Sequence, residues 1–170
     1  MGEKITHDDI DRQFNLLRSD PQKFLDLTNE FVEQRPRDAG AYFVRHQAWS
    51  QLGHPERALA DLDKSIELEN RPAPHEARGR VLQDLGRYRE AIEAYDRCER
   101  LDPTQWKGGF GPLFRADCHA RLGDEAAALA DCETMPDDHW TPGLFGAPAG
   151  TKSEVAIELR RRAVAARGRL

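Results

Sequence analysis

The chain has 170 residues, a formal net charge of −5, 39% hydrophobic residues and 32% charged residues. No run of about 18 apolar residues occurs, so we expect no membrane-spanning helix. Residues 1–9 are too polar for a signal peptide, and the negative charge argues against nucleic acid as a partner. We therefore expect a cytoplasmic protein that binds no membrane and for which nucleic acid is a disfavoured partner.

Three cysteines, Cys98, Cys118 and Cys132, all fall on expected helices. They are typical of small buried hydrophobic residues in a reducing compartment. No pair has the spacing of metal ligands, so we expect no metal and no cofactor. Five of the 25 basic residues are lysines and 20 are arginines, a bias typical of a GC-rich bacterial genome.

The chain begins with two expected helices. Residues 6–18 form the first, because apolar residues recur there at helical spacing. Asp20 and Pro21 begin the second, over 21–35, as N-cap and first helical residue. Its expected buried face consists of Phe24, Leu25, Thr28, Phe31 and Val32.

Leu-Gly pairs then mark three turns, at Gly53, Gly86 and Gly123. Glycine accepts the left-handed backbone conformation that ends a helix and reverses the chain. Each pair is followed within about six residues by small and aliphatic residues at helical spacing. The pattern predicts a helix–turn–helix unit that is repeated along the chain.

The clearest unit covers residues 72–105. Its second helix is amphipathic, with an aromatic residue at Tyr95, and it ends before Pro103. Small residues stand where its two helices cross, at Gly79 and Ala91, and one turn after the aromatic residue, at Cys98. In these features the segment resembles a tetratricopeptide repeat, a helical hairpin of about 34 residues.

This resemblance implies an all-α fold, a right-handed superhelix of stacked antiparallel helix hairpins in one array over residues 1–170. The longer gap between the second and third glycines implies a few inserted residues between Trp106 and Phe110. The array ends with an ordered, non-helical loop and a capping helix in which Thr151 and Glu154 form a capping box. The expected segments are units 5–38, 39–71, 72–105 and 109–142, loop 136–150 and helix 151–168.

His46 departs from the family pattern, which has a small residue at that position. Either the two helices separate slightly there, or the ring turns into the groove; we favour a structural role because no set of ligands is nearby. Loop 136–150 also has two interpretations. One is a cover on the end of the array and the other is a lid on a ligand. Its apolar residues Trp140, Leu144 and Phe145 favour the cover.

The sequence contains no convincing catalytic set. Asp117, Cys118 and His119 are neighbours on a helix, where successive side chains point about 100° apart and cannot act together. The acidic and histidine residues at 137–139 are too few for a metal site. We therefore expect no enzymatic activity.

The resemblance instead implies a scaffold that binds a protein or peptide. In this family the first helix of each unit lines the concave face, so its side chains that are not needed for packing are the candidate contacts. They are Gln13, Phe43, Gln47, Ser50, Gln51, Glu76, Arg80, Gln83, Asp84, Phe110, Asp117 and Arg121.

Two alternatives remain open. In the first alternative, the chain is a self-associating structural element, a homo-oligomer that uses Trp106, Trp140 and Phe145 as a contact patch. Alternatively, its arginine-rich C-terminal helix contacts an acidic partner or nucleic acid. Residues 152–170 carry six basic and two acidic residues, a net charge of +4, which leaves −9 on the rest of the chain.

Overall fold

The computed structural model describes residues 15–136, 140–143 and 146–169. Most of the first expected helix lies outside these residues, and 15–19 at its end are helical. The chain folds into two compact units, residues 1–70 and 71–170. We refer to them as the N-terminal unit and the C-terminal unit; a single array over the whole chain stays a prediction.

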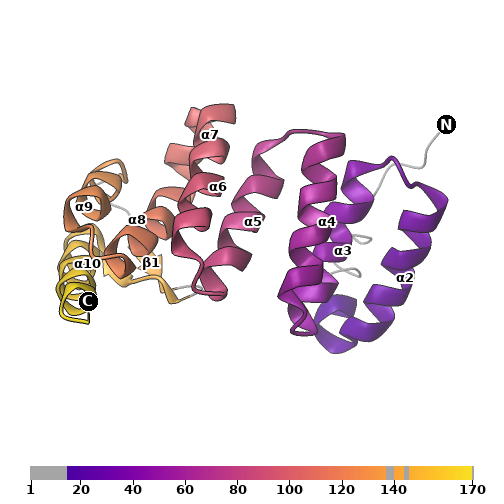
Figure 1. Ribbon diagram of the computed structural model, residues 1–170, viewed down its shortest axis with the longest axis horizontal. Coiled ribbons are helices and arrows are strands. Elements are labelled where there is room, and N and C mark those ends of the chain that lie inside the picture. The colour runs from indigo at the N-terminus through magenta and orange to yellow at the C-terminus, as the bar shows by residue number, and fades with distance from the viewer. Residues whose placement is uncertain (1–14, 137–139, 144–145, 170) are drawn as a thin grey trace. The chain divides into compact units, whose positions relative to one another are not determined.

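The N-terminal unit contains helices α2 (Pro21–Gln34), α3 (Ala39–Gln51) and α4 (Pro55–Leu68). Consecutive helices pack side by side and are joined by short turns (Figure 1). The side chain of Asp20 accepts a hydrogen bond from the backbone N–H of Lys23, as expected for an N-cap. The core consists of Phe24, Leu25 and Ala48, with Leu16, Leu17, Val44, Trp49 and Leu52 packed against them.

The structure corrects one prediction for this unit, the burial of Phe31, and bears on the two interpretations of His46. Phe31 was expected on the buried face of α2 but is 43% exposed. Helix α3 begins at that end of α2 with Ala39, Gly40 and Ala41, whose side chains are too small to cover a phenylalanine ring. His46 is buried, with its Nδ1 hydrogen-bonded to the carbonyl oxygen of Phe43, which agrees with a structural role.

The C-terminal unit contains two helical hairpins followed by a strand pair and a last helix (Figure 1). The short helix α7 lies in the expected insertion and is capped by the side chain of Asp102. The elements are α5 (Pro72–Asp84), α6 (Tyr88–Leu101), α7 (Pro103–Gly108), α8 (Gly111–Arg121), α9 (Glu125–Glu133), β1 (Trp140–Pro142), β2 (Ala149–Thr151) and α10 (Lys152–Arg167).

Close contact between α5 and α6 depends on Gly79. A Cβ atom added there would lie 2.5 Å from the ring of Tyr95, which is fully buried. Gly111 has the same role between α7 and α8, since its added Cβ would lie 2.2 Å from the ring of Trp106. The three turn glycines, Gly53, Gly86 and Gly123, have φ values of 74°, 71° and 82°, as their positions after helices require.

An arginine–aspartate pair recurs in both units. Arg45 on α3 donates two hydrogen bonds to Asp61 on α4, at 2.8 and 2.6 Å. Arg115 on α8 pairs in the same way with Asp131 on α9, again 16 residues later. Each arginine also contacts a residue 16 positions earlier, on the second helix of the preceding hairpin: Asn29 for Arg45 and Glu99 for Arg115. One half-buried cation therefore joins three helices in each unit.

The loop before α10 is ordered where it is described, and it contains two strands that the sequence analysis did not predict. Strands β1 and β2 pair antiparallel, with Thr141 opposite Gly150. Thr141 is fully buried and its hydroxyl donates to the carbonyl oxygen of Pro148 at 2.6 Å. Helix α10 follows, with the expected capping box of Thr151 and Glu154, and it packs against α8 and α9.

Candidate functional site

Helix α3 carries four of the predicted contact residues in a stripe along one face. Phe43 and Gln47 are half-buried, and Ser50 and Gln51 are exposed. Their spacing of four, seven and eight residues places them on one face of the helix. The ring of Phe43 also contacts the ring of His46, with centroids 5.0 Å apart. Gln13, predicted on the preceding helix, lies outside the described residues.

Helix α5 repeats this stripe 33 residues later. Glu76 and Arg80 are half-buried, and Asp84 is exposed at the end of the helix. Desolvation by the surrounding residues of this chain raises the pKa of the Asp84 carboxyl. The positive charge of Arg80, one turn earlier, opposes that shift. We call Phe43, Gln47, Ser50 and Gln51 the α3 row, and Glu76, Arg80 and Asp84 the α5 row.

Gln83, predicted as a contact residue on α5, is instead a buried link within the C-terminal unit. It is 7% exposed. Its amide oxygen accepts a hydrogen bond from the Tyr95 hydroxyl at 3.0 Å, and its amide nitrogen donates to Asp117 Oδ2 at 2.8 Å. Both ends of the side chain are therefore used inside the protein.

Asp117 is also withdrawn from the surface. Its carboxylate is completely buried and accepts hydrogen bonds from Arg121 Nε, at 2.6 Å, and from Arg162 Nη1 on α10. A buried carboxylate needs such partners, because desolvation of an unpaired charge costs several kcal/mol. Asp117 therefore holds α10 against α8.

Arg121 and the loop complete this network. The guanidinium of Arg121 lies over the ring of Tyr88, 5.5 Å from its centroid. The carbonyl oxygen of Gly146 accepts from Arg162 Nη1 at 2.8 Å and from Arg121 Nη2 at 3.4 Å. The loop and α10 thus already occupy the polar groups that the sequence analysis assigned to a ligand at this end of the chain.

Three of the predicted contact residues, Gln83, Asp117 and Arg121, therefore form an internal network in the structure. Sequence reasoning missed Arg162, which lies 45 residues after Asp117 on a helix treated as a cap. Phe110, the remaining predicted residue of this unit, is 38% exposed. It stands before α8, with its ring 6.3 Å from that of Phe114.

Trp106 is 3% exposed, so it cannot belong to a self-association patch, contrary to the sequence analysis. The reason is its position on α7, which turns the indole inward, beneath Gly111 and against Tyr95, with the guanidinium of Arg115 over the ring at 4.9 Å. Phe145 and the side chain of Trp140, the other two proposed patch residues, lie outside the described part of the chain.

The cysteine and the acidic and histidine residues weighed as reactive groups in the sequence can now be placed. Cys118 is fully buried, and desolvation raises the pKa of its thiol, which opposes formation of a nucleophilic thiolate. No cluster of three metal-ligating side chains occurs among the described residues. Residues 137–139, whose carboxylates and histidine were weighed as ligands, lie outside them.

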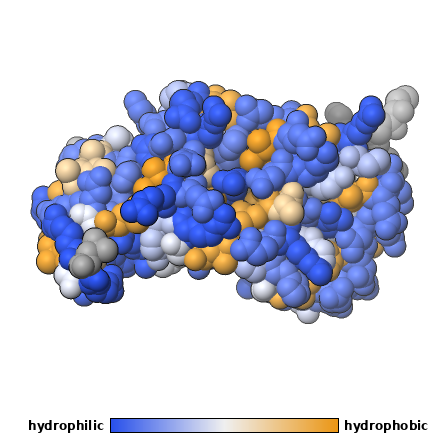
Figure 2. All heavy atoms as spheres, viewed as in Figure 1, coloured by the Kyte–Doolittle hydropathy of each residue, from blue (hydrophilic) through white to orange (hydrophobic). Residues whose placement is uncertain are grey.

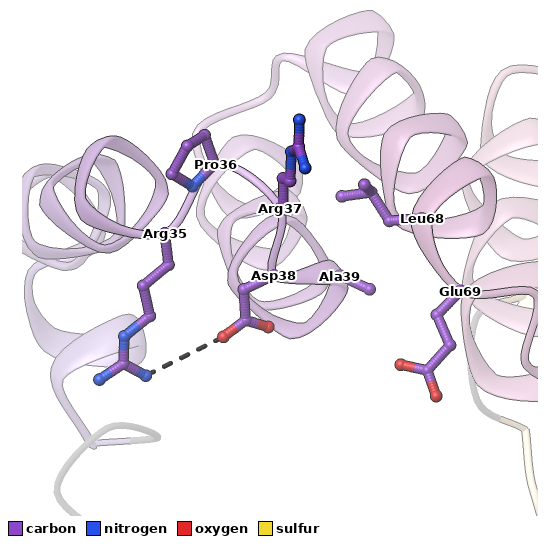
Figure 3. Close-up of a pocket in the computed structure, with 7 residues that line it drawn as sticks. All are labelled: Arg35, Pro36, Arg37, Asp38, Ala39, Leu68 and Glu69. Atoms are coloured by element: carbon purple, nitrogen blue, oxygen red, sulfur yellow. Dashed lines mark ion pairs between the residues drawn. The ribbon is translucent and has the colours of Figure 1, made fainter.

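The N-terminal unit also has an open surface depression of about 690 Å³. It is bounded by the turn between α2 and α3 and by the end of α4 (Figure 3). Arg35 points toward Asp38 across its rim, at 3.9 Å, while Leu68 and Ala39 form its apolar part. None of the predicted contact residues lines it.

The face seen in Figure 2 is mainly hydrophilic, with hydrophobic residues in small separate patches. Among the described helices, none combines the length and apolar character that crossing a membrane requires. Both observations fit the high fraction of charged residues.

The family model for the tetratricopeptide repeat matches residues 72–105, the α5–α6 hairpin with its glycine–tyrosine contact. This segment is therefore similar to a tetratricopeptide repeat. No curated protein matches the chain in sequence.

Two solved structures are similar to the fold. MamA superposes with a TM-score of 0.67 at 14% identity, covering 98% of this chain and 97% of its own. TTC0263, a thermophilic tetratricopeptide-repeat protein of Thermus thermophilus, gives a TM-score of 0.61 at 22% identity, covering 91% and 77%. These likenesses agree with the helical hairpins described above for each unit.

Proposed function

We propose that the chain is a non-catalytic scaffold that binds a protein or peptide segment through the α3 row and the α5 row. The supporting observation is the repeated stripe: α3 and α5 carry, at the same spacing, side chains that are half-buried or exposed. Gln47 and Arg80 occupy equivalent positions, 33 residues apart. Repeat proteins commonly bind partners with equivalent positions of successive units.

The chemistry of the two rows favours an extended polar segment. The amides of Gln47 and Gln51 both donate and accept hydrogen bonds, as the backbone of an extended peptide requires. Arg80 and Asp84 offer charges of both signs, and the half-buried ring of Phe43 offers an apolar contact. Binding in the micromolar range, about −8 kcal/mol, is what we expect from contacts of this kind.

The proposal also places the protein in a reducing compartment, the cytoplasm of a bacterial cell. Its support is the state of the cysteines: Cys98, Cys118 and Cys132 are all buried, free thiols. The arginine bias supports the bacterial source.

The test is capture of the partner from the source cell with tagged protein. Gln47→Ala and Arg80→Ala, made separately, should each weaken capture several-fold, because each removes polar contacts from one row. Gln34→Ala at the end of α2 and Arg97→Ala on α6 are matched controls, since both side chains are exposed and outside the rows. The melting temperature of each variant is measured as well, so that capture is compared among folded proteins. Undiminished capture by both row variants would reject the proposed surface.

A further inference from the structure

The last helix, α10, exposes two large hydrophobic side chains. Ile157 is 63% exposed and Val164 is 58% exposed. Every other exposed large hydrophobic residue in the described ranges lies at 43% or below. The two are seven residues apart, two helical turns or about 10.5 Å along the axis, so they lie on the same side of the helix.

This side is not the one that attaches α10 to the unit. Val155, Leu159 and Ala163 are fully buried and form the face packed on α8 and α9. Helix α10 is therefore apolar on two sides, one covered and one open. Single exposed hydrophobic residues are ordinary, but two in register on one helix form a linear contact site.

Arginines flank the open side. Arg160 and Arg161 follow Ile157 by three and four residues, which places one on each side of the line to Val164. Their side chains are 56% and 75% exposed. Arg160 lies 3.9 Å from Glu125, and Arg161 pairs with Glu158 at 2.7 Å. Both side chains are largely exposed, so other carboxylates can still reach the two guanidinium groups.

We propose that the open side of α10 binds an acidic amphipathic helix of a partner protein. Such a helix carries apolar side chains seven residues apart, in register with Ile157 and Val164, and carboxylates beside them to pair with Arg160 and Arg161. The charge of the segment supports this choice: residues 152–170 carry +4 within a chain of −5. This site is separate from the α3 and α5 rows.

Two other occupants fit the surface less well. A nucleic acid would pair with the arginines but would leave both aliphatic side chains in water, and the remainder of the chain, at −9, would repel it. A second copy docked through the same side of α10 would place the arginines of the two copies against each other, as a two-fold contact requires. An acidic helix satisfies both the apolar and the charged groups.

The test uses a designed peptide as the probe: an 18-residue helix of alanine, glutamate and leucine, with leucines seven residues apart and glutamates beside them. We expect fluorescence anisotropy to show binding at about 100 µM. Ile157→Ser combined with Val164→Ser should weaken binding about tenfold or more, and Arg160→Gln combined with Arg161→Gln should remove its salt dependence. Ala165→Ser, exposed on the same helix, is the matched control.

Four results would overturn the proposal. The first is no binding of the acidic peptide at millimolar concentration, and the second is equal binding of a peptide with lysine in place of glutamate. The third is tighter binding of a single-stranded oligonucleotide than of the peptide. The fourth is self-association of the chain by light scattering that the double serine variant abolishes. Circular dichroism melts of the variants establish that each is folded.

Discussion

At the scale of single residues, burial decides which side chains carry chemistry. The three cysteines illustrate this, because each thiol is enclosed by a helix interface rather than presented to solvent. Desolvation raises the pKa of Cys98 to about 11 and raises those of Cys118 and Cys132 as well. A thiol with a raised pKa forms little thiolate, which is the reactive species.

We predict that the folded protein reacts slowly with thiol reagents. For Cys98 the thiolate fraction at neutral pH falls roughly a hundredfold below that of a free cysteine. Titration with a chromogenic disulfide should release little colour from native protein and three equivalents after denaturation in urea. Rapid labelling of any one cysteine under native conditions would show that its interface opens.

Gly79 has a different importance, because it sets how closely α5 approaches α6. Replacement by alanine places a methyl group where the Tyr95 ring lies, 2.5 Å away. Overpacking of this kind costs about 1–3 kcal/mol, which exceeds the gain in helix propensity of about 1 kcal/mol. We predict that Gly79→Ala lowers the free energy of unfolding in urea by up to about 2 kcal/mol. Gly108→Ala, with nothing within 4 Å of its added Cβ, is the control and should change it by less than about 1 kcal/mol.

At the scale of elements, the attachment of α10 to α8 depends on a buried ion network rather than on apolar packing alone. Asp117 accepts hydrogen bonds from two arginines and from Gln83. Its removal takes one acceptor from each of two partly exposed guanidinium groups and leaves the buried amide nitrogen of Gln83 without the acceptor it has in the structure. The cost of breaking a buried pair is typically about 3–5 kcal/mol.

We predict that Asp117→Ala destabilises the C-terminal unit by about 3 kcal/mol, measured by urea unfolding. Asp84→Ala is the matched control, because Asp84 was an equal candidate from the sequence yet is exposed; it should cost less than about 0.5 kcal/mol. Similar effects of the two substitutions would contradict the difference in burial between the two carboxylates.

An ion-pair cluster within α10 has a pH dependence. Hydrogen bonds from Arg161 and Arg162 hold the pKa of Glu158 at about 2, below its ordinary value of 4.5. Since the pKa is lowered by folding, the stabilisation is complete above pH 4.5 and is lost as the pH falls from there toward 2. We predict that Glu158→Gln is less stable than wild type at about pH 6 and that the difference shrinks at about pH 3. A difference that stays constant across this range would show that Glu158 does not contribute through its charge.

At the scale of the whole chain, the regular features of the repeats could be predicted from the sequence. The Leu-Gly pairs placed the turns after α3, α5 and α8, since only glycine readily accepts the positive φ found there. Proline and aspartate placed the start of α2, and Thr151 with Glu154 placed the start of α10. These signals are local, so a single sequence contains them.

The candidate site could be predicted only where it is local to one helix. The α3 and α5 rows follow from helical spacing. The burial of Gln83 and Asp117 does not, because it depends on Tyr95 and on Arg162, which come from other elements of the unit. The β1–β2 pair could not be predicted either, because its strands of three residues have no periodic pattern that distinguishes them from a loop.

The most direct test of the proposed function is photo-crosslinking in the source cell. A photoreactive phenylalanine analogue is placed in the rows, at Ser50 or at Asp84, and for comparison at Ala60 on α4 or at Arg97 on α6, all exposed positions. The account predicts that the two row positions crosslink the same partner protein and that the two comparison positions do not. Equal crosslinking from all four positions, or crosslinking from Ala60 and Arg97 alone, would contradict it.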